Sequence, residues 1–472
     1  MLRRIRLFNR KLSTNVKPKV IADENVISNV ENQSYKARHH PGIVKLKTVS
    51  LPDNIVKAIT KITADYPIKA LVTNSDLLGR HLRYRVPPME SDQLNDLKHK
   101  LYKQELWKEK DSKIQSEEKF HQKIKDKVKI LLKEKVYNWS PINYDQQQSL
   151  LYLFARSSME YAVLAKIFLE ISNRDPDFKP RTLFDFGSGV GSVTWAANTY
   201  WKKHLFEYYN VDISSDMNDL ALTILRGGPG YSNQNIKGVF YRQFLPATNV
   251  MFDLVVSAYS LLELPSFNTR MDTILRLWNK TNKYLIIVEN GSNAGFKVIN
   301  EARDFILKMN QSNQGHIFSP CPHDLVCPRF LADDNTPCNF EINYFHIPLT
   351  NKFEMQKERY SYIVFKKSVD KDSTQNWPRV VRETLVRSKH CICRTCTADG
   401  KLSEVIFTAS KHGKTMYHCA RSTKWGDRLP IILDENAQNS NNLDTKTNSG
   451  KRDLCSLTAE ENLDKKSSEN NT

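Results

Sequence analysis

The spacing of apolar residues predicts two helical stretches in the first third of the chain. Residues 91–136 combine alternating charge signs with apolar residues at helical spacing, which predicts a long solvated helix or a pair of helices. A second stretch, from Asp145 to Ile171, carries an apolar stripe that we expect to pack against the next part of the chain: Leu150, Leu153, Phe154, Tyr161, Leu164, Ile167 and Phe168.

After Pro180 the pattern changes to short apolar runs separated by helical stretches. The predicted strands are Thr182–Phe186, Glu207–Ile213, Phe252–Ala258 and Tyr284–Glu289. Strands that alternate with helices form a parallel sheet with both faces covered, so we predict an α/β fold. From about Trp377 to Pro430, short β-like segments with glycine turns predict a smaller second domain.

Composition narrows the classes of protein that this chain can belong to. Of its 472 residues, 40% are apolar and 26% are charged, which is enough apolar material for a sizeable core. No apolar run approaches the roughly 18 residues of a membrane-spanning helix, so we expect no membrane partner. The 70 Lys and Arg residues outnumber the 52 Asp and Glu residues, and the net charge of +18 favours a polyanionic partner.

The two ends of the chain differ in composition from the middle. Residues 1–22 are basic and contain no acid, and Leu2, Ile5, Leu7 and Phe8 lie between the arginines. Such a segment resembles a mitochondrial transit peptide, and a basic nucleic-acid-binding arm is the alternative. Residues 436–472 are polar, with few large apolar side chains, and predict a disordered tail.

The strongest local motif is the glycine-rich segment 183–191, which follows a predicted strand and precedes a helical stretch. Glycines allow bare N–H groups to approach a ligand at a helix N-terminus. Ser192 stands where a nicotinamide fingerprint has Gly, and no Lys-Ser/Thr pair follows, which excludes a P-loop. Asp185 precedes the first glycine by two positions, and Asp212 follows Asp185 by 27 positions. A carboxylate at position 212 can accept hydrogen bonds from both hydroxyls of a ribose.

These residues resemble the S-adenosylmethionine-dependent methyltransferases of class I, which have a Rossmann-like core. The resemblance implies that the glycine loop approaches the amino-acid part of the cofactor. It also implies that the first acid orients this part and that the second acid holds the ribose. The cofactor-binding residues would then be Asp185, Gly187, Gly189, Gly191 and Asp212.

Residues for methyl transfer are harder to find than residues for cofactor binding. Amino-group methyltransferases commonly have Asn or Asp, two prolines and an aromatic residue after the fourth strand, but Ser257–Leu262 contains no proline. Cys321, between two prolines, superficially suits a cytosine C5 methyltransferase, which needs a nucleophilic Cys. It follows the Tyr284–Glu289 strand and lies among other cysteines. We therefore predict no catalytic residue.

The cysteines suggest a metal site. Eight cysteines in 472 residues are too few for a disulfide scaffold, and their clustering favours metal ligation in a reducing compartment. Thiolates from two regions can hold zinc or an iron–sulfur cluster. A zinc ribbon usually has two Cys-x-x-Cys pairs, whereas this chain has one, Cys393–Cys396. The spacing favours a cluster and leaves zinc as the alternative.

Several strings together resemble the methyltransferase-like protein 17 family of mitochondrial small-ribosomal-subunit assembly factors. The resemblance covers about residues 145–435. It rests on Asp185–Gly191, Val288–Ser292 with Gly295 and Phe296, Ser319–Asp324 with Cys327 and Pro328, Cys396–Gly400, and Ala420 and Arg421 with Lys424–Asp427.

The resemblance implies a matrix protein that binds small-subunit rRNA at the head–body junction and binds S-adenosylmethionine without transferring its methyl group. An active rRNA methyltransferase is the alternative. The family also carries a four-iron–four-sulfur (4Fe–4S) cluster. By motif, its ligands would be Cys321, Cys327, Cys338 and Cys396. The gap before Cys338 is longer than usual in the family, and Cys393 competes with Cys396 for the fourth place.

We expect a monomer whose partners are the rRNA and proteins of the mitochondrial small subunit. The predicted parts are a transit peptide (1–22), a mostly helical region (23–175), a methyltransferase-like domain with a Cys-rich insertion (176–370), a basic β-rich domain (371–435) and a disordered tail (436–472). Basic residues in the fourth part predict an RNA-binding surface: Arg379, Arg382, Arg387, Lys389, Arg394, Lys401, Lys411, Lys414, Arg421, Lys424 and Arg428.

Overall fold

The computed structural model describes residues 19–109, 116–246, 250–310, 315–348 and 354–434. Residues 1–18 of the predicted transit peptide and the predicted tail, 436–472, lie outside the described residues. Residues 22–432 form one compact unit. The described residues at the two ends of the chain belong to β1 (Lys19–Ala22) and β14 (Ile431–Asp434), which form a two-stranded sheet.

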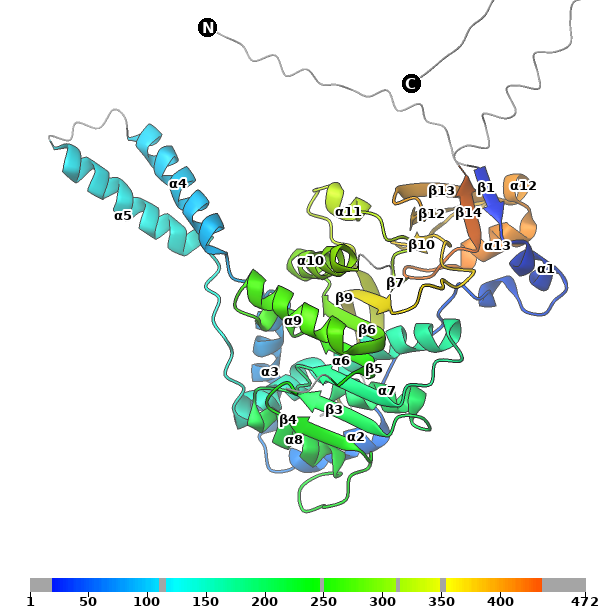
Figure 1. Ribbon diagram of the computed structural model, residues 1–472, viewed down its shortest axis with the longest axis horizontal. Helices are drawn as coiled ribbons and strands as arrows, with labels where there is room; N and C mark the ends of the chain where they lie inside the picture. The colour runs from blue at the N-terminus through cyan, green and yellow to red at the C-terminus, as the bar shows by residue number, and fades with distance from the viewer. Residues whose placement is uncertain (1–18, 110–115, 247–249, 311–314, 349–353, 435–472) are drawn as a thin grey trace, which may run out of the picture. The chain divides into compact units, whose positions relative to one another are not determined.

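The core of the compact unit is an eight-stranded sheet (Figure 1). Along the sheet the order is β4-β3-β2-β5-β6-β9-β7, with β8 also paired to β9. Strands β2 to β6 are parallel, whereas β9 runs antiparallel to its neighbours. The strands are β2 (Thr182–Phe186), β3 (Glu207–Val211), β4 (Val239–Arg242), β5 (Phe252–Ala258), β6 (Thr281–Asn290), β7 (His316–Ser319), β8 (Phe340–Phe345) and β9 (Met355–Lys366).

This strand order is the doubly wound order of Rossmann-like folds, in which the chain reverses direction across the sheet beside its first strand. It confirms the predicted α/β methyltransferase-like core. The four strands predicted from apolar runs are present, and β3 ends at Val211, before the predicted end at Ile213. Strands β4, β7, β8 and β9 were not predicted. β4 and β7 have only four residues each, and exposed polar residues interrupt the apolar pattern in the first part of β9.

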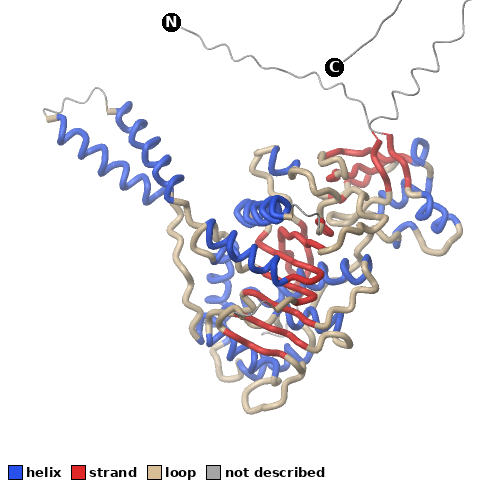
Figure 2. Tube along the Cα trace, viewed as in Figure 1, coloured by secondary structure: helices blue, strands red, loops and turns tan. Residues whose placement is uncertain are grey.

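Helices cover both faces of the sheet, as Figure 2 shows. Neighbouring residues of each strand point to opposite faces, so Leu183 joins the apolar cluster of one face and Phe184 that of the other. The first face is covered by α2 (Asp53–Ile62), α3 (Ile68–Arg83), α6 (Gln146–Arg174), α7 (Ser192–Trp201) and α8 (Ser215–Leu225). The second is covered by α9 (Phe267–Lys280) and α10 (Asn293–Met309).

The predicted helix pair is α4 (Ser91–Lys108) and α5 (Glu117–Lys135). The two helices pack through a small cluster of Leu101, Ile124 and Val128 and are otherwise largely polar. The predicted stripe from Asp145 to Ile171 forms α6, whose apolar residues are buried against the sheet. None of the described helices has the length and apolar content needed to cross a bilayer.

A smaller antiparallel sheet follows the core. Its strands are β10 (Arg379–Val380), β11 (Leu385–Val386), β12 (His390–Cys396) and β13 (Leu402–Thr408), and β12 pairs with the other three. Two short helices, which the sequence pattern did not predict, come after β13: α12 (Ala409–His412) and α13 (Lys414–Ser422). The remaining short elements are α1 (Glu24–Glu31), η1 (Ala37–His39), η2 (Leu261–Glu263) and α11 (Pro328–Leu331).

Candidate functional site

A cavity of about 670 Å³ lies at the carboxyl ends of the central strands. Its wall includes residues that directly follow β2, β3 and β5, together with the last residue of β6. The crevice beside the first strand of a doubly wound sheet is where ligands bind in this class of fold. Of the predicted cofactor-binding residues, Gly187, Gly189 and Asp212 line this cavity.

The glycine loop needs its glycines for the conformation of its backbone. Gly187, Gly189 and Gly191 have φ values of +70°, +49° and +94°, in the region that side chains disfavour. A Cβ added at position 187 would lie 2.5 Å from the Cβ of Ser260. The loop is therefore held close to the end of β5, and Gly191 caps the start of α7.

Asp212 joins the glycine loop to the end of β3. Its Oδ2 accepts a hydrogen bond from the Gly189 N–H (2.9 Å), and its Oδ1 accepts one from the Ser214 N–H (3.0 Å). Burial raises the pKa of Asp212, and these two backbone hydrogen bonds oppose that effect by favouring the carboxylate. The carboxylate thus borders the cavity in a fixed orientation.

Two predicted cofactor-binding residues do not form part of the cavity wall. The Asp185 side chain is fully buried, and its two carboxyl oxygens have no hydrogen-bond partner among the described residues. Burial raises the pKa of Asp185, and the nearby Asp212 and Glu160 raise it further. Gly191 faces the Tyr241 hydroxyl and the Trp195 ring. Their roles toward a cofactor remain predictions.

Polar residues of α6 that the sequence analysis did not identify complete the site. Glu160 is buried, and its Oε2 accepts a hydrogen bond from Ser192 Oγ (3.1 Å), at the start of α7. Its Oε1 accepts one from the Tyr152 hydroxyl (2.5 Å) and lies 3.5 Å from Arg156 Nε. Tyr152 and Arg156 line the cavity. The signal in the sequence was a pair of opposite charges four residues apart inside an apolar helix.

The four predicted metal-ligating thiols line a second, smaller cavity. Cys321 follows β7, Cys327 precedes α11, Cys338 precedes β8 and Cys396 ends β12. Burial raises the pKa of Cys321 to about 11. Burial also raises the pKa of Cys338 and Cys396, and the neighbouring thiols raise both further. Because all four thiols line one cavity, residues far apart in the sequence lie close together.

The donor set at this cavity fits an iron–sulfur cluster. Four thiols are the donors that such clusters use. The positive charge of Arg303 lowers the pKa of Cys321 against the effect of burial, and Arg379 and Arg382 line the cavity, so cations lie beside the thiols. In the described part of the chain, no group of three or more His, Cys, Asp or Glu side chains is arranged to hold a single metal ion.

Cys393, the rival for the fourth place, faces away from this cavity. Side chains alternate between the two faces along a strand, and Cys396 comes an odd number of positions after Cys393, so the two point to opposite faces of β12. Cys393 Sγ lies 3.8 Å from the Thr384 hydroxyl and 3.7 Å from the Ala420 carbonyl oxygen. By contrast, Cys396 Sγ lies 3.4 Å from Nε2 of His323, which belongs to the Cys-rich insertion that also carries Cys321 and Cys327.

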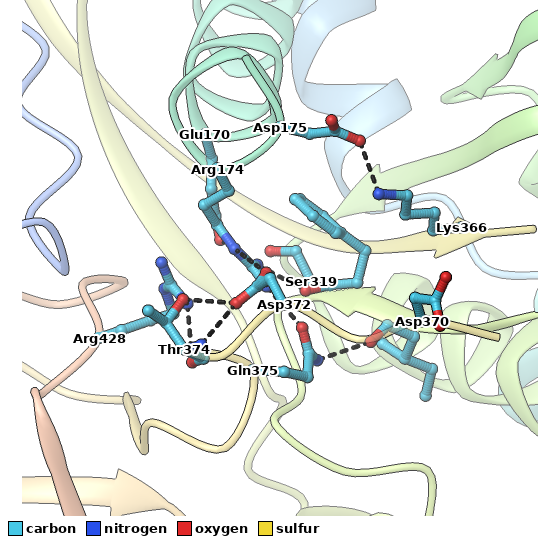
Figure 3. A network of polar contacts seen from close by, with 12 residues as sticks. Glu170, Arg174, Asp175, Ser319, Lys366, Asp370, Asp372, Thr374, Gln375 and Arg428 are labelled. Carbon is cyan, nitrogen blue, oxygen red and sulfur yellow. Dashed lines mark hydrogen bonds and ion pairs between the residues drawn. The ribbon is translucent and has the colours of Figure 1, made fainter. Parts of the chain in front are cut away.

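A network of buried charges lies beside α6, and Figure 3 shows its residues Glu170, Arg174 and Asp372. Arg379 Nη2 donates to Glu170 Oε1 (2.7 Å), and Arg379 Nε donates to the carbonyl of Pro320 (2.9 Å). Arg174 binds Glu170 (3.1 Å) and Asp372 (2.6 Å) in the same network. The ion pairs therefore fix the backbone directly before the first thiol.

Two of the basic residues predicted to bind RNA belong instead to this buried network, so that part of the prediction is wrong. Arg379 and Arg428 are 2% and 3% exposed, so they stabilise the fold and cannot contact RNA. Arg382 is half-buried and stacks on the Trp425 ring, 5.2 Å from its centroid. The other predicted basic residues are exposed: Arg387, Lys389, Arg394, Lys401, Lys411, Lys414, Arg421 and Lys424.

The comparisons with known proteins agree on one family. Residues 146–430 match the family model described as mitochondrial small ribosomal subunit Rsm22. The human ribosome assembly protein METTL17, mitochondrial, is 37% identical over 401 residues, which are 84% of this chain and 86% of that protein. Rsm22-cox11 tandem protein 2, mitochondrial, from Schizosaccharomyces pombe is 25% identical over 342 residues, which are 60% of this chain and 43% of that protein.

Solved structures that resemble this chain include several methyltransferases. One is the magnesium protoporphyrin IX methyltransferase ChlM from Synechocystis with bound SAH. It is 14% identical, covers 51% of this chain and 95% of its own, and gives a TM-score of 0.29. The fold assignment rests on the strand order of the sheet itself.

Proposed function

The chain belongs to the mitochondrial small ribosomal subunit Rsm22 family, and from this premise we propose that it is an assembly factor of that subunit in the mitochondrial matrix. The human relative is named as a mitochondrial ribosome assembly protein. The basic N-terminal segment, with the composition of a transit peptide, supports the same compartment. The protein acts as a monomer on immature small subunits, with rRNA and ribosomal proteins as its partners.

In this proposal the protein binds small-subunit rRNA at the head–body junction. Eight exposed Lys and Arg residues of the C-terminal region, within a chain of net charge +18, support it. Arg421 Nη1 donates to the carbonyl of Arg387 (2.8 Å), so these two basic residues are neighbours on the surface, and Lys389 lies in the same turn. Such a surface neutralises phosphates and releases counterions.

We expect the triple change of Arg387, Lys389 and Arg421 to Gln to weaken rRNA binding and to reduce its salt dependence. Each lost phosphate contact lowers the slope of log affinity against log salt by about 0.7–0.9, so the loss of three contacts should lower the slope by about 2–3. Fluorescence anisotropy with a labelled rRNA fragment from the junction measures the slope. Lys308→Gln, an exposed residue of α10, is the control. A wild-type affinity that does not change with salt would contradict the proposal.

We also propose that the larger cavity binds S-adenosylmethionine. The observation that carries this step is the position of the glycine loop and Asp212 at the cavity wall, at the carboxyl ends of adjacent strands. When bound, this cofactor would supply an activated methyl group. Asp212 would accept hydrogen bonds from the ribose hydroxyls, and Gly187 and Gly189 would let the backbone approach the ligand. Asp185 would orient the amino-acid part of the cofactor and Gly191 would complete the glycine loop, although neither residue lines the cavity.

We propose that the chain does not transfer the methyl group. None of the seven described cysteines lines the larger cavity, so among the described residues no thiol nucleophile faces it. The segment after β5 presents Tyr259 and Ser260 there, in place of the Asn-Pro-Pro-aromatic type of acceptor loop. Labelled cofactor incubated with pre-ribosomal RNA should therefore give no transfer.

Cofactor binding is testable with a matched pair of variants. Asp212→Asn should weaken binding of S-adenosylhomocysteine about 10- to 100-fold, because hydrogen bonds that involve a charged group contribute about 1.5–3 kcal/mol. Isothermal titration calorimetry on the full chain measures the affinity. Asp253→Asn is the control, because Asp253 also accepts a backbone hydrogen bond (Arg181 N–H, 2.9 Å) but lies at the opposite end of the strands. Equal losses in both variants would contradict the assignment of Asp212.

The last part of the proposal is that the smaller cavity holds a metal cluster. A 4Fe–4S cluster held by Cys321, Cys327, Cys338 and Cys396 would join the Cys-rich insertion to the small sheet. Zinc is the alternative occupant. The cluster is a structural group here, because metal binding adds its free energy to the folded state of the two segments that provide the ligands.

A further inference from the structure

The helix pair α4–α5 is joined to the rest of the compact unit by two segments, and both form part of the wall of the larger cavity. We call these segments the first stem (residues 82–85) and the second stem (residues 139–144). The stem residues that line the cavity are Leu82, Arg85, Pro141, Ile142 and Tyr144. Within the described part of the chain, no residue of α4 or α5 itself lines the cavity. In Figure 1 the two helices lie side by side beyond the stems.

Arg85 holds the two stems to each other and to the cavity wall. Its Nη2 donates to the carbonyl of Ser140 in the second stem (2.8 Å), and its guanidinium carbon lies 5.1 Å from the centroid of the Trp139 ring. Its Nε lies 2.8 Å from Oε1 of Glu263, which lines the cavity. Because Arg85 is 1% exposed, water does not compete for these contacts. A ligand that fixes this part of the wall therefore also fixes one stem relative to the other.

The second stem is also connected to the residues around Asp212. The Ser214 N–H donates to Asp212 Oδ1 (3.0 Å), and the Ser214 hydroxyl donates to the carbonyl of Tyr144 (2.6 Å). At the other end of the stem, Trp139 Nε1 donates to the carbonyl of Leu262 (3.3 Å), a residue of the cavity wall. Both hydrogen bonds join the stem to backbone that borders the proposed ligand position.

The helix pair depends on its stems because its own core is small. Leu101, Ile124 and Val128 are the buried apolar residues between α4 and α5. Helices in proteins obtain most of their stability from tertiary packing, and three buried side chains provide little of it. Holding the two ends of the pair together lowers the conformational entropy that the pair would gain on unfolding. The stability of the pair should therefore follow how firmly the stems are held.

We propose that the larger cavity is an effector site, whose adenosyl ligand holds the two stems in place and thereby stabilises the α4–α5 pair. A ligand shifts a conformational equilibrium only when it binds one state more tightly than the other. A ligand in contact with both stems meets this condition, because it loses contacts when the stems separate. The inference rests on the proposed binding of S-adenosylmethionine, and it gives that binding a use that requires no methyl transfer. With the cavity filled, the helix pair has one fixed orientation toward the immature subunit.

Amide hydrogen exchange of the full chain, with and without S-adenosylhomocysteine, tests this coupling. Contact with the ligand cannot by itself protect α4 and α5, because neither helix lines the cavity. With ligand at about 100 times its dissociation constant, mass action limits the protection to about 100-fold. We expect exchange in both helices to slow by about fivefold or more, the lower end of typical coupling between sites. Exchange in α13, which also does not line the cavity, should not change.

Trp139→Phe separates the coupling from ligand binding. Trp139 belongs to the second stem but does not line the cavity, and the change removes its hydrogen bond to Leu262 while keeping a ring beside Arg85. We expect calorimetry to give an affinity for S-adenosylhomocysteine close to that of the wild-type protein. The protection of α4 and α5 should fall by about twofold or more, the effect of one neutral hydrogen bond. Trp107→Phe, at an exposed position of α4, is the matched control and should keep the full protection.

The outcomes distinguish the effector role from the proposed cofactor. If S-adenosylhomocysteine binds to the wild-type protein but exchange in α4 and α5 does not change, the inference is overturned and the proposed cofactor is left intact. Equal protection in Trp139→Phe and Trp107→Phe, whether full or lost, would also overturn it, because the contact made by the stem would then have no specific effect. Failure of the wild-type protein to bind S-adenosylhomocysteine would overturn the proposed cofactor and the effector role together.

Discussion

Replacing Glu170 by Gln is expected to lower the free energy of unfolding by about 3–5 kcal/mol. The change leaves the buried guanidiniums of Arg379 and Arg174 without their shared counter-charge, and removing one partner of a buried ion pair typically has this cost. The three side chains are 5%, 2% and 4% exposed, so water cannot replace the lost carboxylate. Urea unfolding followed by far-UV circular dichroism measures the difference.

The pH dependence of the free energy of unfolding provides a second test of the contribution of the Glu170 carboxylate. Burial by itself raises the pKa of Glu170, but Arg379 and Arg174 outweigh burial and hold the pKa well below its usual value. A folded-state pKa below the unfolded value means that the contribution is complete above about pH 4 and is lost as the pH falls further. The Glu170→Gln variant should therefore lose less stability than the wild-type protein between neutral pH and acid.

An exposed ion pair is the control for this prediction. Arg394 and Glu404 pair at 3.2 Å across β12 and β13, with side chains 44% and 53% exposed. Glu404→Gln should change the free energy of unfolding by less than about 1 kcal/mol, because water and salt screen such pairs. Similar losses for Glu404→Gln and Glu170→Gln would show that the buried network carries no special stability.

The glycine loop could be predicted from the sequence because its signal is local. Gly187 and Gly189 lie within a few residues of each other, and the strand and helix on either side are also encoded nearby. Asp212 could be found because the next parallel strand comes after one helix. Features encoded within one βαβ unit are therefore visible in a single sequence.

Residues whose role depends on packing could not be assigned in this way. Arg379 and Arg387 look alike in a basic stretch, yet the first is buried against Glu170 and the second is exposed. Only the packing of α6 against the segment after β9 distinguishes them. Arg156 was overlooked for a similar reason, because a charged residue in an apolar helix shows its purpose only when the cavity beside it is known.

The cysteine site could be predicted only in part from the sequence. Their types and clustering suggested a metal site, but the spacing alone left Cys393 and Cys396 as rivals. The structure separates the two, because β12 turns Cys396 toward the small cavity and Cys393 toward α13. Their opposite orientation makes the two cysteines a matched pair for an experiment.

Replacing any one of Cys321, Cys327, Cys338 or Cys396 by Ser is expected to remove the proposed cluster and to destabilise the junction that it would hold. A Ser hydroxyl does not replace the soft thiolate that iron prefers, and structural metal sites contribute on the order of 10 kcal/mol to folding. Iron, acid-labile sulfide and zinc content after anaerobic purification measure the loading, and thermal unfolding measures the junction. The wild-type protein should contain iron and sulfide in equal amounts.

Cys393→Ser is the control, because Cys393 lies on the same strand but faces α13. It should keep its iron and sulfide, whereas each of the four ligand variants should lose both. Iron retained in Cys338→Ser would remove the third ligand from the proposal. Zinc as the only metal in the wild-type protein would replace the cluster by the alternative ion, although four convergent thiols would still be needed to hold it. Because the thiols come from separate segments, loss of loading and loss of stability should appear together in the same variants.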